Sequence, residues 1–145
     1  MSVNDSIGFI ISKTARKLNQ MLSIQFQPYD ITTEQWSVLN KLAEEGGITQ
    51  KELSCRIEKD PTNVTRILDQ LERKGWIERV ANEEDRRSFL TYATESGRAL
   101  SDELEPIEKE FVQSILHSVS DEEIALLRSI MARINANLEA KSSEV

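Results

Sequence analysis

Two short polar groups in the middle of the chain carry the side chains best suited to binding chemistry. The first follows a proline and holds hydroxyl, amide and guanidinium groups, and the second is one aspartate followed by two arginines. An asparagine amide can pair bidentately with adenine, and an arginine can pair with guanine or phosphate. These residue types predict contacts to double-stranded DNA. The predicted contact residues are Pro61, Thr62, Asn63, Thr65, Arg66, Asp85, Arg86 and Arg87.

A helix that begins at Pro61 is expected to present the first group. Asp60 suits an N-cap, and a proline at the first helical position loses no hydrogen bond. Gly75 suits the left-handed residue that ends a helix. The start of such a helix offers free N–H groups to a phosphate and points into the groove in helix-turn-helix docking. The apolar face that the spacing predicts is Val64, Ile67, Leu68 and Leu71.

A two-stranded wing is expected to present the second group. Residues 76–80 and 88–93 have strand composition, and residues 82–85 form a polar turn between them. An arginine at the end of such a wing can enter the minor groove, where negative potential is concentrated. We predict that Asp85 holds Arg87 by a bidentate ion pair. The alternative for both polar groups is an ordinary solvated surface.

Helical spacing and capping boxes place the remaining elements. Three pairs fit the pattern S/T-x-x-E/Q, namely Thr32 with Gln35, Thr49 with Glu52 and Ser120 with Glu123. The helix that Thr49 begins ends only a few residues before Pro61, which predicts a helix-turn-helix. Pro106 is expected to bend the fifth helix. The helices are predicted over residues 4–27, 32–45, 49–58, from 61, 95–118 and from 120 onward.

The net charge of −7 excludes a globally basic nucleic-acid coat. The charge is uneven, because residues 50–94 carry nine basic and nine acidic side chains, whereas residues 95–145 carry five and eleven. A DNA-binding protein with this balance must work through local placement of a few cations. The middle third of the chain is the part least repelled by phosphate.

The sequence lacks the patterns expected of catalysis, metal binding or membrane insertion. His117 has no partner at a recognisable spacing, no glycine-rich phosphate loop occurs, and no His/Cys/Asp cluster has metal-ligand spacing. We therefore expect neither an enzyme nor a cofactor. The single cysteine excludes an internal disulfide, and no apolar run reaches the length of a membrane span. These features predict a soluble cytoplasmic protein.

The terminal helices carry more apolar residues than one small winged helix can cover. A second copy of the chain is the simplest surface to cover them, so we predict a symmetric homodimer. The alternative is that the long helices pack only on their own winged helix. The predicted fold is mainly α with a small β-wing. Residues 32–94 form the winged helix-turn-helix DNA-binding region, and residues 1–31 and 95–145 form the dimerisation helices of a single intertwined domain.

The run from Asp60 to Gly97 resembles the MarR family of bacterial winged helix-turn-helix regulators. The stretch VTRILDQLERKGWIERVANEEDRRSFLTYATESG is similar to that family's recognition helix, wing and entry to the dimerisation helix, including the D-x-R signature at Asp85 and Arg87. Ala93-Thr94 stands where the family usually has Leu-Thr, which affects packing more than DNA contact. The resemblance implies interlocked terminal helices, a recognition helix in each major groove and a wing arginine, here Arg87, in each adjacent minor groove.

The resemblance also implies a sensor. Members of the family often bind small phenolic or amphipathic molecules between the dimer helices and the winged helix, and four residues come from the segments bordering such a cleft: Arg16, Phe26, Tyr29 and Trp36. The apolar spacing of Phe26 and Trp36 indicates core positions as the alternative. Other members sense oxidants through a cysteine in the first helix. Cys55 does not match that position, although Lys51 could lower its pKa.

Together these patterns predict a DNA-binding transcriptional regulator. We expect a repressor that binds a near-palindromic operator as a homodimer and is released by a small ligand. One alternative is a winged helix that acts as a protein-interaction module without sequence-specific DNA binding, which the acidic C-terminus would suit. Another is a small-molecule-binding or enzymatic helical dimer that has lost DNA contact. The residues Thr62, Asn63, Arg66 and Arg87 argue against both alternatives.

Overall fold

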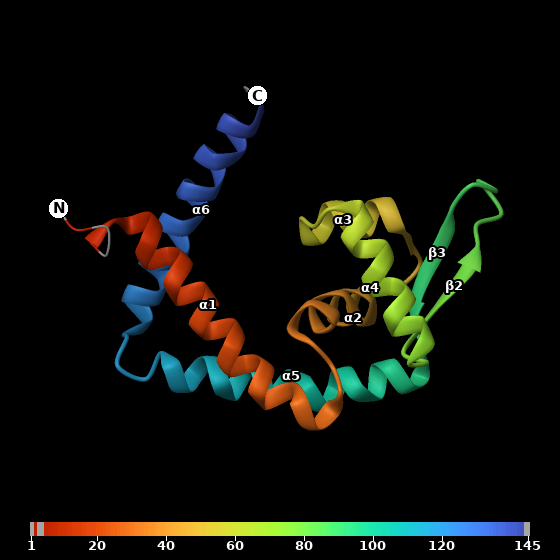
Figure 1. Cartoon of the computed structure of the whole chain (residues 1–145), viewed down its shortest axis with the longest axis horizontal. Coiled ribbons are helices and arrows are strands. Elements are labelled where there is room, and N and C mark those ends of the chain that lie inside the picture. Colours follow the sequence, from red (N-terminus) through yellow and green to blue (C-terminus); the bar gives the residue numbers. More distant parts are fainter. Residues whose placement is uncertain (1, 3–4, 144–145) are drawn as a thin grey trace. The chain divides into compact units, whose positions relative to one another are not determined.

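The computed structural model describes residue 2 and residues 5–143. It is mainly helical with one small sheet, as predicted (Figure 1). Residue 4, the predicted start of the first helix, lies outside the described residues. The elements are α1 (Ile7–Phe26), η2 (Gln27–Tyr29), α2 (Thr33–Glu44), β1 (Ile48–Thr49), α3 (Gln50–Ile57), α4 (Pro61–Arg73), β2 (Ile77–Ala81), β3 (Phe89–Ala93), α5 (Glu95–Ile115) and α6 (Asp121–Ser143).

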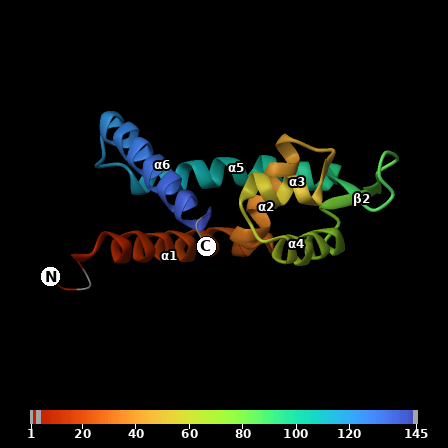
Figure 2. The ribbon, with the colours of Figure 1, turned by 90° about the horizontal axis from the view of Figure 1, so that it is seen from above.

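The chain divides into two compact units, Met1–Glu108 and Lys109–Val145. The first unit holds α1 to α4, the sheet and the first two-thirds of α5. Within it, the β2–β3 hairpin extends away from the group of α2, α3 and α4 in both views (Figures 1 and 2). The second unit holds the end of α5 and the whole of α6. The winged helix therefore lies entirely in the first unit.

Side-chain caps begin the helices where the sequence predicts them. Thr32 and Gln35 form a reciprocal capping box at α2, and Thr49 does the same with Glu52 at α3. The Asp60 carboxylate accepts a hydrogen bond from the Asn63 backbone N–H at 3.3 Å and so caps α4. Each cap satisfies N–H groups that have no partner inside the helix. The predicted starts of these helices are therefore confirmed to within one residue.

The core of the first unit is built from the apolar faces of α2 and α4. Val64, Ile67, Leu68 and Leu71 of α4 are buried, as the spacing predicts. They pack with α2 and α3 residues that are also buried. Large side chains from α1 and α5 complete the core. The further buried apolar residues include Phe26, Trp36, Val38, Leu39, Leu42, Leu53, Ile77 and Leu104.

The sheet has three antiparallel strands in the order β1-β3-β2, one more than the sequence predicts. The additional strand, β1, is only two residues long, and Ile48 pairs with Thr91 of β3. The buried Thr91 hydroxyl also donates to the Ile48 carbonyl oxygen at 2.8 Å. A two-residue strand has no alternating pattern, so only its pairing partner reveals it. The prediction of a two-stranded wing is corrected to a wing with a third strand at its base.

The fifth helix, α5, starts beside Gly75, just after the end of α4, and it ends earlier than predicted. The Thr94 hydroxyl accepts from the Gly97 N–H at 3.1 Å, and it donates to the Gly75 carbonyl oxygen at 2.7 Å. The helix ends at Ile115 rather than at Ser118, because the chain must leave the helix before Ser120 caps α6. Pro106 lies inside α5, and the bend expected there stays a prediction.

The last helix exposes its apolar side chains. No residue of α6 within the described range is buried, and Leu126, Leu127 and Leu138 are each at least half exposed. Its start follows the Ser120–Glu123 capping box, which also holds the pKa of the Glu123 carboxyl below its ordinary value through hydrogen bonds from Ser120. None of the helices over residues 5–143 combines the length and the hydropathy that a membrane span requires.

Candidate nucleic-acid interface

The first turn of α4 presents polar side chains on the side opposite its buried face. Pro61 takes the first helical position, and Thr62 is exposed beside it. Asn63 is half-buried, and its backbone N–H is used by the Asp60 cap. The helix thus begins with an exposed first residue pair, and the N–H groups of Asn63 and Val64 already bond to Asp60. This is the arrangement that helix-turn-helix docking requires of a recognition helix.

Arg66 lies between an amide and a carboxylate. Its guanidinium donates to the Asn63 amide oxygen one turn earlier, and Nη2 lies 3.1 Å from Oε2 of Glu34 on α2. Arg66 and Glu34 are both more than half exposed, so the ion pair is weak and accessible. Asn63 and Arg66 therefore act as one hydrogen-bonded pair before DNA is bound. Glu34 was not predicted from the sequence, because it is distant along the chain.

Thr65 is held by the fold rather than offered to a partner. Its hydroxyl donates to the Pro61 carbonyl oxygen at 3.0 Å and accepts a hydrogen bond from the Gln50 amide on α3. This contact joins the two helices of the helix-turn-helix. Thr65 stays in the predicted contact set, but its hydroxyl is already engaged on both sides.

The turn of the wing is ordered by local hydrogen bonds. Asn82 and Ser88 close it, with Asn82 Nδ2 donating to Ser88 Oγ at 3.0 Å. Asp85 Oδ1 accepts from the Arg87 backbone N–H at 3.0 Å. The predicted Asp85–Arg87 ion pair is wrong, because the carboxylate binds the backbone N–H two residues ahead, as aspartate does in tight turns. Within the described residues, the exposed guanidinium of Arg87 has no ion-pair partner.

A hollow connects the start of α4 with the wing. It has a volume of about 450 Å³ and is bordered by Pro61 on α4, Lys51 on α3 and Arg87 on the wing, with Phe89 where β3 leaves the turn. Lys51 and Arg87 contribute two positive charges and Asp85 contributes one negative charge, so the hollow has a net charge of +1. A second hollow of about 550 Å³ is bordered by residues from Gly47 to Leu90 that include three carboxylates, Glu52, Glu83 and Glu84. Phosphate would be attracted to the first hollow and repelled by the second.

Arg79 of β2 joins the wing to α4. Its Nη2 lies 2.5 Å from Asp69 Oδ1 and 2.9 Å from Glu72 Oε1. These hydrogen bonds hold the pKa of the Glu72 carboxyl below its ordinary value and raise the pKa of Arg79. Sequence reasoning did not predict this cluster. The signal that could have found it is the spacing of Asp69 and Glu72, which places two carboxylates on one helical stripe near the following strand.

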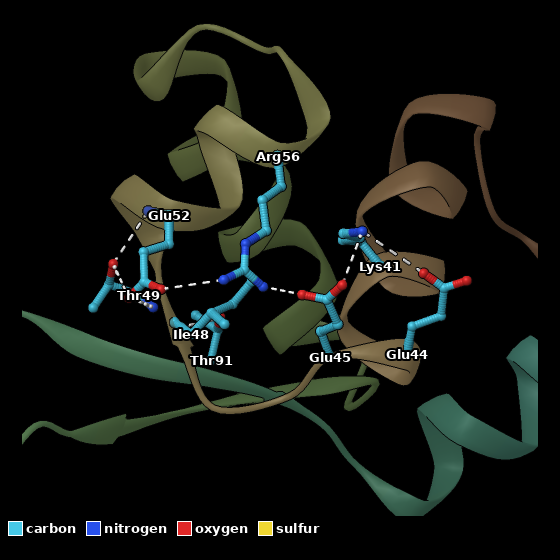
Figure 3. A network of polar contacts seen from close by, with 8 residues as sticks. All are labelled: Lys41, Glu44, Glu45, Ile48, Thr49, Glu52, Arg56 and Thr91. Carbon is cyan, nitrogen blue, oxygen red and sulfur yellow. Dashed lines mark hydrogen bonds and ion pairs between the residues drawn. The ribbon is translucent and has the colours of Figure 1, made fainter.

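A second network holds α3 against α2 (Figure 3). The Arg56 guanidinium pairs with Glu45 at the end of α2, and its other nitrogen lies 3.5 Å from Glu52 on α3. Lys41 lies 3.2 Å from Glu45 and extends the network along α2. These contacts fix the first helix of the helix-turn-helix, and they lie outside both predicted contact groups.

The four predicted ligand residues occupy different environments. Phe26 and Trp36 are buried in the core, with their rings edge-to-face at 5.8 Å. The Trp36 indole N–H also donates to Glu108. Tyr29 is half-buried and Arg16 is exposed. The structure therefore brings Phe26 and Trp36 together and places them in the core, which is the alternative that their spacing indicated.

Cys55 and His117, the other side chains considered for chemistry, lie outside the contact groups described above. Cys55 is exposed on α3. The His117 ring nitrogen Nδ1 lies 2.9 Å from the Ser114 carbonyl oxygen one turn earlier. Over residues 2 and 5–143, no group of three or more histidine, cysteine, aspartate or glutamate side chains is arranged to hold a metal ion.

Comparisons with known proteins agree with this architecture. The model of the MarR family matches residues 31–89. The multiple antibiotic resistance protein MarR of Salmonella typhimurium is 31% identical over 129 residues, covering 88% of this chain and 90% of that protein. The transcriptional repressor MprA of Escherichia coli is 33% identical over 96 residues, covering 66% of this chain and 54% of that protein.

Solved structures agree at the level of the whole chain. The transcriptional regulator SlyA superposes with a TM-score of 0.87 at 26% identity, covering 94% of this chain and 96% of that one. A mutant MarR from E. coli complexed with operator DNA gives a TM-score of 0.84 at 28% identity, covering 92% and 99%. The chain therefore belongs to the MarR family: it is a transcriptional regulator with a DNA-binding winged helix, and it is not an enzyme.

Proposed function

We propose that this regulator is a repressor that binds a near-palindromic operator as a homodimer and leaves it when a small ligand binds. In this proposal, residues 32–94 contact DNA, while residues 1–31 and 95–145 hold the two subunits together. The first turn of each α4 enters a major groove, and each Arg87 enters the adjacent minor groove. Because the protein acts on chromosomal DNA, we place it in the cytoplasm. The related MprA is named as a transcriptional repressor, which supports the direction of regulation.

One observation carries the DNA-binding geometry. Pro61 at the start of α4 and Arg87 on the wing border the same hollow, and with Lys51 and Asp85 its net charge is +1. If α4 lies in a major groove and Arg87 in the next minor groove, the sugar-phosphate strand between the grooves must cross this hollow. Its charge suits that strand. The operator complex of the related E. coli MarR supports a role in binding operator DNA for this fold.

Exposed apolar side chains support the homodimer. On α1, Ile7, Met21 and Ile24 are each more than half exposed, and on α6 the same holds for Leu126 and Leu138. Apolar surface of this extent on terminal helices is typical of an interface between subunits. A two-fold dimer presents two recognition helices, and half-sites on one face of B-form DNA are about 34 Å apart. This spacing predicts the near-palindrome.

The DNA contacts can be tested with the duplex that the wild-type protein selects from a random-sequence pool. Arg87→Ala should weaken binding to this selected duplex in fluorescence anisotropy and reduce the salt slope by about one. Asn63→Ala should weaken binding to the selected duplex more than to a random duplex, because an asparagine that reads a base carries specificity. Arg98→Ala, an exposed arginine on α5, is the control.

The selection experiment separates the proposal from the protein-interaction alternative, and the variants test the roles of Arg87 and Asn63. If no duplex is enriched and the affinity does not depend on salt, the chain is not a sequence-specific DNA-binding protein. If Arg87→Ala and Arg98→Ala have the same effect, the wing does not contact DNA as proposed. Equal losses on selected and random duplexes for Asn63→Ala would remove its base-reading role.

The release by a ligand has its own test. Trp36 is buried next to Phe26 in the first unit, so its fluorescence reports changes in that part of the core. Salicylate, as a small phenolic probe, should shift the tryptophan emission and release the selected duplex in the same concentration range. Trp76→Phe leaves Trp36 as the single tryptophan and makes the signal specific. If salicylate shifted the tryptophan emission but did not release the selected duplex, ligand binding would not control DNA binding as proposed.

A further inference from the structure

One arginine on the wing, Arg79, forms ion pairs with two carboxylates on α4, Asp69 and Glu72. Arg79 Nη2 lies 2.5 Å from Asp69 Oδ1 and 2.9 Å from Glu72 Oε1, and Nε lies 3.3 Å from Glu72 Oε2. Asp69 and Glu72 are one turn apart on α4, whereas Arg79 is in the middle of β2. A planar guanidinium that bonds to two carboxylates has little freedom to rotate. The direction in which β2 leaves α4 is therefore fixed.

Arg79 lies in the same row of paired residues as the strand β1, which holds the opposite edge of the hairpin. Arg79 is the pairing partner of Thr91, and Thr91 is the partner of Ile48 in β1. The Thr91 hydroxyl also donates to the Ile48 carbonyl oxygen at 2.8 Å (Figure 3). Leu90, the next residue of β3, pairs with Thr49 of β1. Both strands of the hairpin are thus attached to the helical part at this end, and residues 81–89, which carry Arg87, extend beyond it.

We infer that Arg79 is a positioning residue: its bonds to Asp69 and Glu72 set the angle of the wing, and thereby the distance between the Asn63 tip of α4 and Arg87. This inference rests on the proposed function, in which both groups contact one duplex. The major and minor grooves lie at fixed positions on B-form DNA. A wing held at the matching angle loses less conformational freedom on binding than a wing that swings.

The charges around Arg79 argue against a direct contact with DNA. Its side chain is only 21% exposed, and two carboxylates that are 43% and 44% exposed already surround it. A guanidinium between two carboxylates offers a phosphate no net positive charge. Arg87 is the opposite case, because it is exposed and has no ion-pair partner among the described residues. Arg79 therefore acts through Arg87 rather than beside it.

The test removes the ion pair without changing the net charge. The double variant Arg79→Met/Glu72→Gln loses one positive and one negative charge and leaves Asp69 as in the wild type. Its affinity for the selected duplex is measured by anisotropy, alone and combined with Arg87→Ala. Interacting residues in such a double-mutant cycle depart from additivity by factors that often reach about tenfold. We expect the loss caused by Arg87→Ala to shrink by about tenfold when Arg79 is replaced.

A matched control is available in the chain. Arg56→Met/Glu45→Gln removes an arginine–glutamate pair that joins α3 to the end of α2, and neither residue borders a hollow beside the wing. Its effect should simply add to that of Arg87→Ala. Urea unfolding shows whether each variant is folded. If Arg79→Met/Glu72→Gln does not fold, Arg79→Lys enters the same cycle, since it keeps the charge and loses the planar fork.

The outcomes separate this inference from the function on which it rests. If Arg87→Ala costs the same affinity with and without the Arg79 ion pair, Arg79 does not position Arg87 and the inference is overturned. If Arg87→Ala costs nothing in the wild-type background, the wing contact of the proposed function fails, and the inference fails with it. A cycle that is non-additive for Arg79 and additive for Arg56 supports both.

Discussion

The guanidinium of Arg66 on α4 lies 3.1 Å from the carboxylate of Glu34 on α2, and both side chains are more than half exposed. Arg66 also donates to the Asn63 amide oxygen. A residue proposed to contact DNA is therefore neutralised by an acid from the neighbouring helix before binding. A DNA strand that binds Arg66 must either displace the Glu34 carboxylate or tolerate its negative charge close to the phosphates. If Arg66 contacts DNA as proposed, this exposed pair sets part of the affinity for DNA.

Replacing Glu34 should strengthen DNA binding. Exposed ion pairs contribute little free energy, so Glu34→Gln should tighten binding to the selected duplex by about two- to fivefold. Anisotropy titrations at several salt concentrations measure the change. Glu44→Gln is the matched control, because Glu44 is an acid on the same helix that pairs with Lys41 at 3.8 Å instead. Weaker binding by Glu34→Gln would mean that Glu34 orients Arg66 for DNA rather than competing for it.

Gly97 should not tolerate a larger residue, although it lies in a helix. A Cβ atom there would come within 2.0 Å of the Trp76 carbonyl oxygen, so the start of α5 would have to move. Gly97→Ala should lower the free energy of unfolding by about 1–3 kcal/mol. Urea unfolding followed by circular dichroism measures it.

Gly8 provides the control for that experiment. It lies in α1, and a Cβ atom there would have nothing within 4 Å. Gly8→Ala should leave the free energy of unfolding unchanged or raise it by up to about 1 kcal/mol, since alanine has the higher helix propensity. If both variants lost stability equally, the close approach of α5 to Trp76 would not be the cause.

The ion pair of Glu72 should make stability depend on pH in mild acid. Arg79 holds the pKa of Glu72 below its ordinary value of 4.5 in the folded chain. The folded state thus binds the proton less readily than the unfolded state, so this carboxylate stabilises the fold above about pH 4.5. The contribution is lost as the pH falls through the lowered pKa.

Urea midpoints between pH 7 and pH 3 measure this dependence. The wild type should exceed Glu72→Gln in stability at pH 7, and the difference should narrow below pH 4.5. The effect is small, because the side chain is 44% exposed. Glu78→Gln, an exposed acid on β2, serves as the control. A difference that grows in acid would contradict the direction of the pKa shift.

A charge on the exposed apolar face of α6 should weaken the dimer. Leu127 is 50% exposed in the single chain. If a second subunit covers it, Leu127→Glu would bury an unpaired carboxylate and weaken association by more than about tenfold. Sedimentation equilibrium measures the change. Ser129→Glu places the same charge about half a turn away on the helix, and its association should stay close to wild type. Equal effects of the two variants would contradict an interface on the Leu127 face.

Local chemistry determined the elements, and it could be predicted from short stretches of sequence. The caps at Thr32, Thr49, Asp60 and Ser120 act within three residues, so their pattern survives in any fold that contains those helices. The buried face of α4 follows from a spacing of three and four residues. Gly75 takes the left-handed conformation predicted for the end of that helix, with φ of 79°.

Tertiary structure decided which polar groups meet, because those contacts join residues distant along the chain. Glu34 reaches Arg66 across 32 positions, and Gln50 reaches Thr65 only because α3 packs against α4. The strand β1 exists only through its pairing with β3. The Asp85 prediction failed on geometry, since its carboxylate meets a backbone N–H before it can reach a flexible guanidinium. Sequence spacing specifies a face of a helix, but packing selects the partner that occupies it.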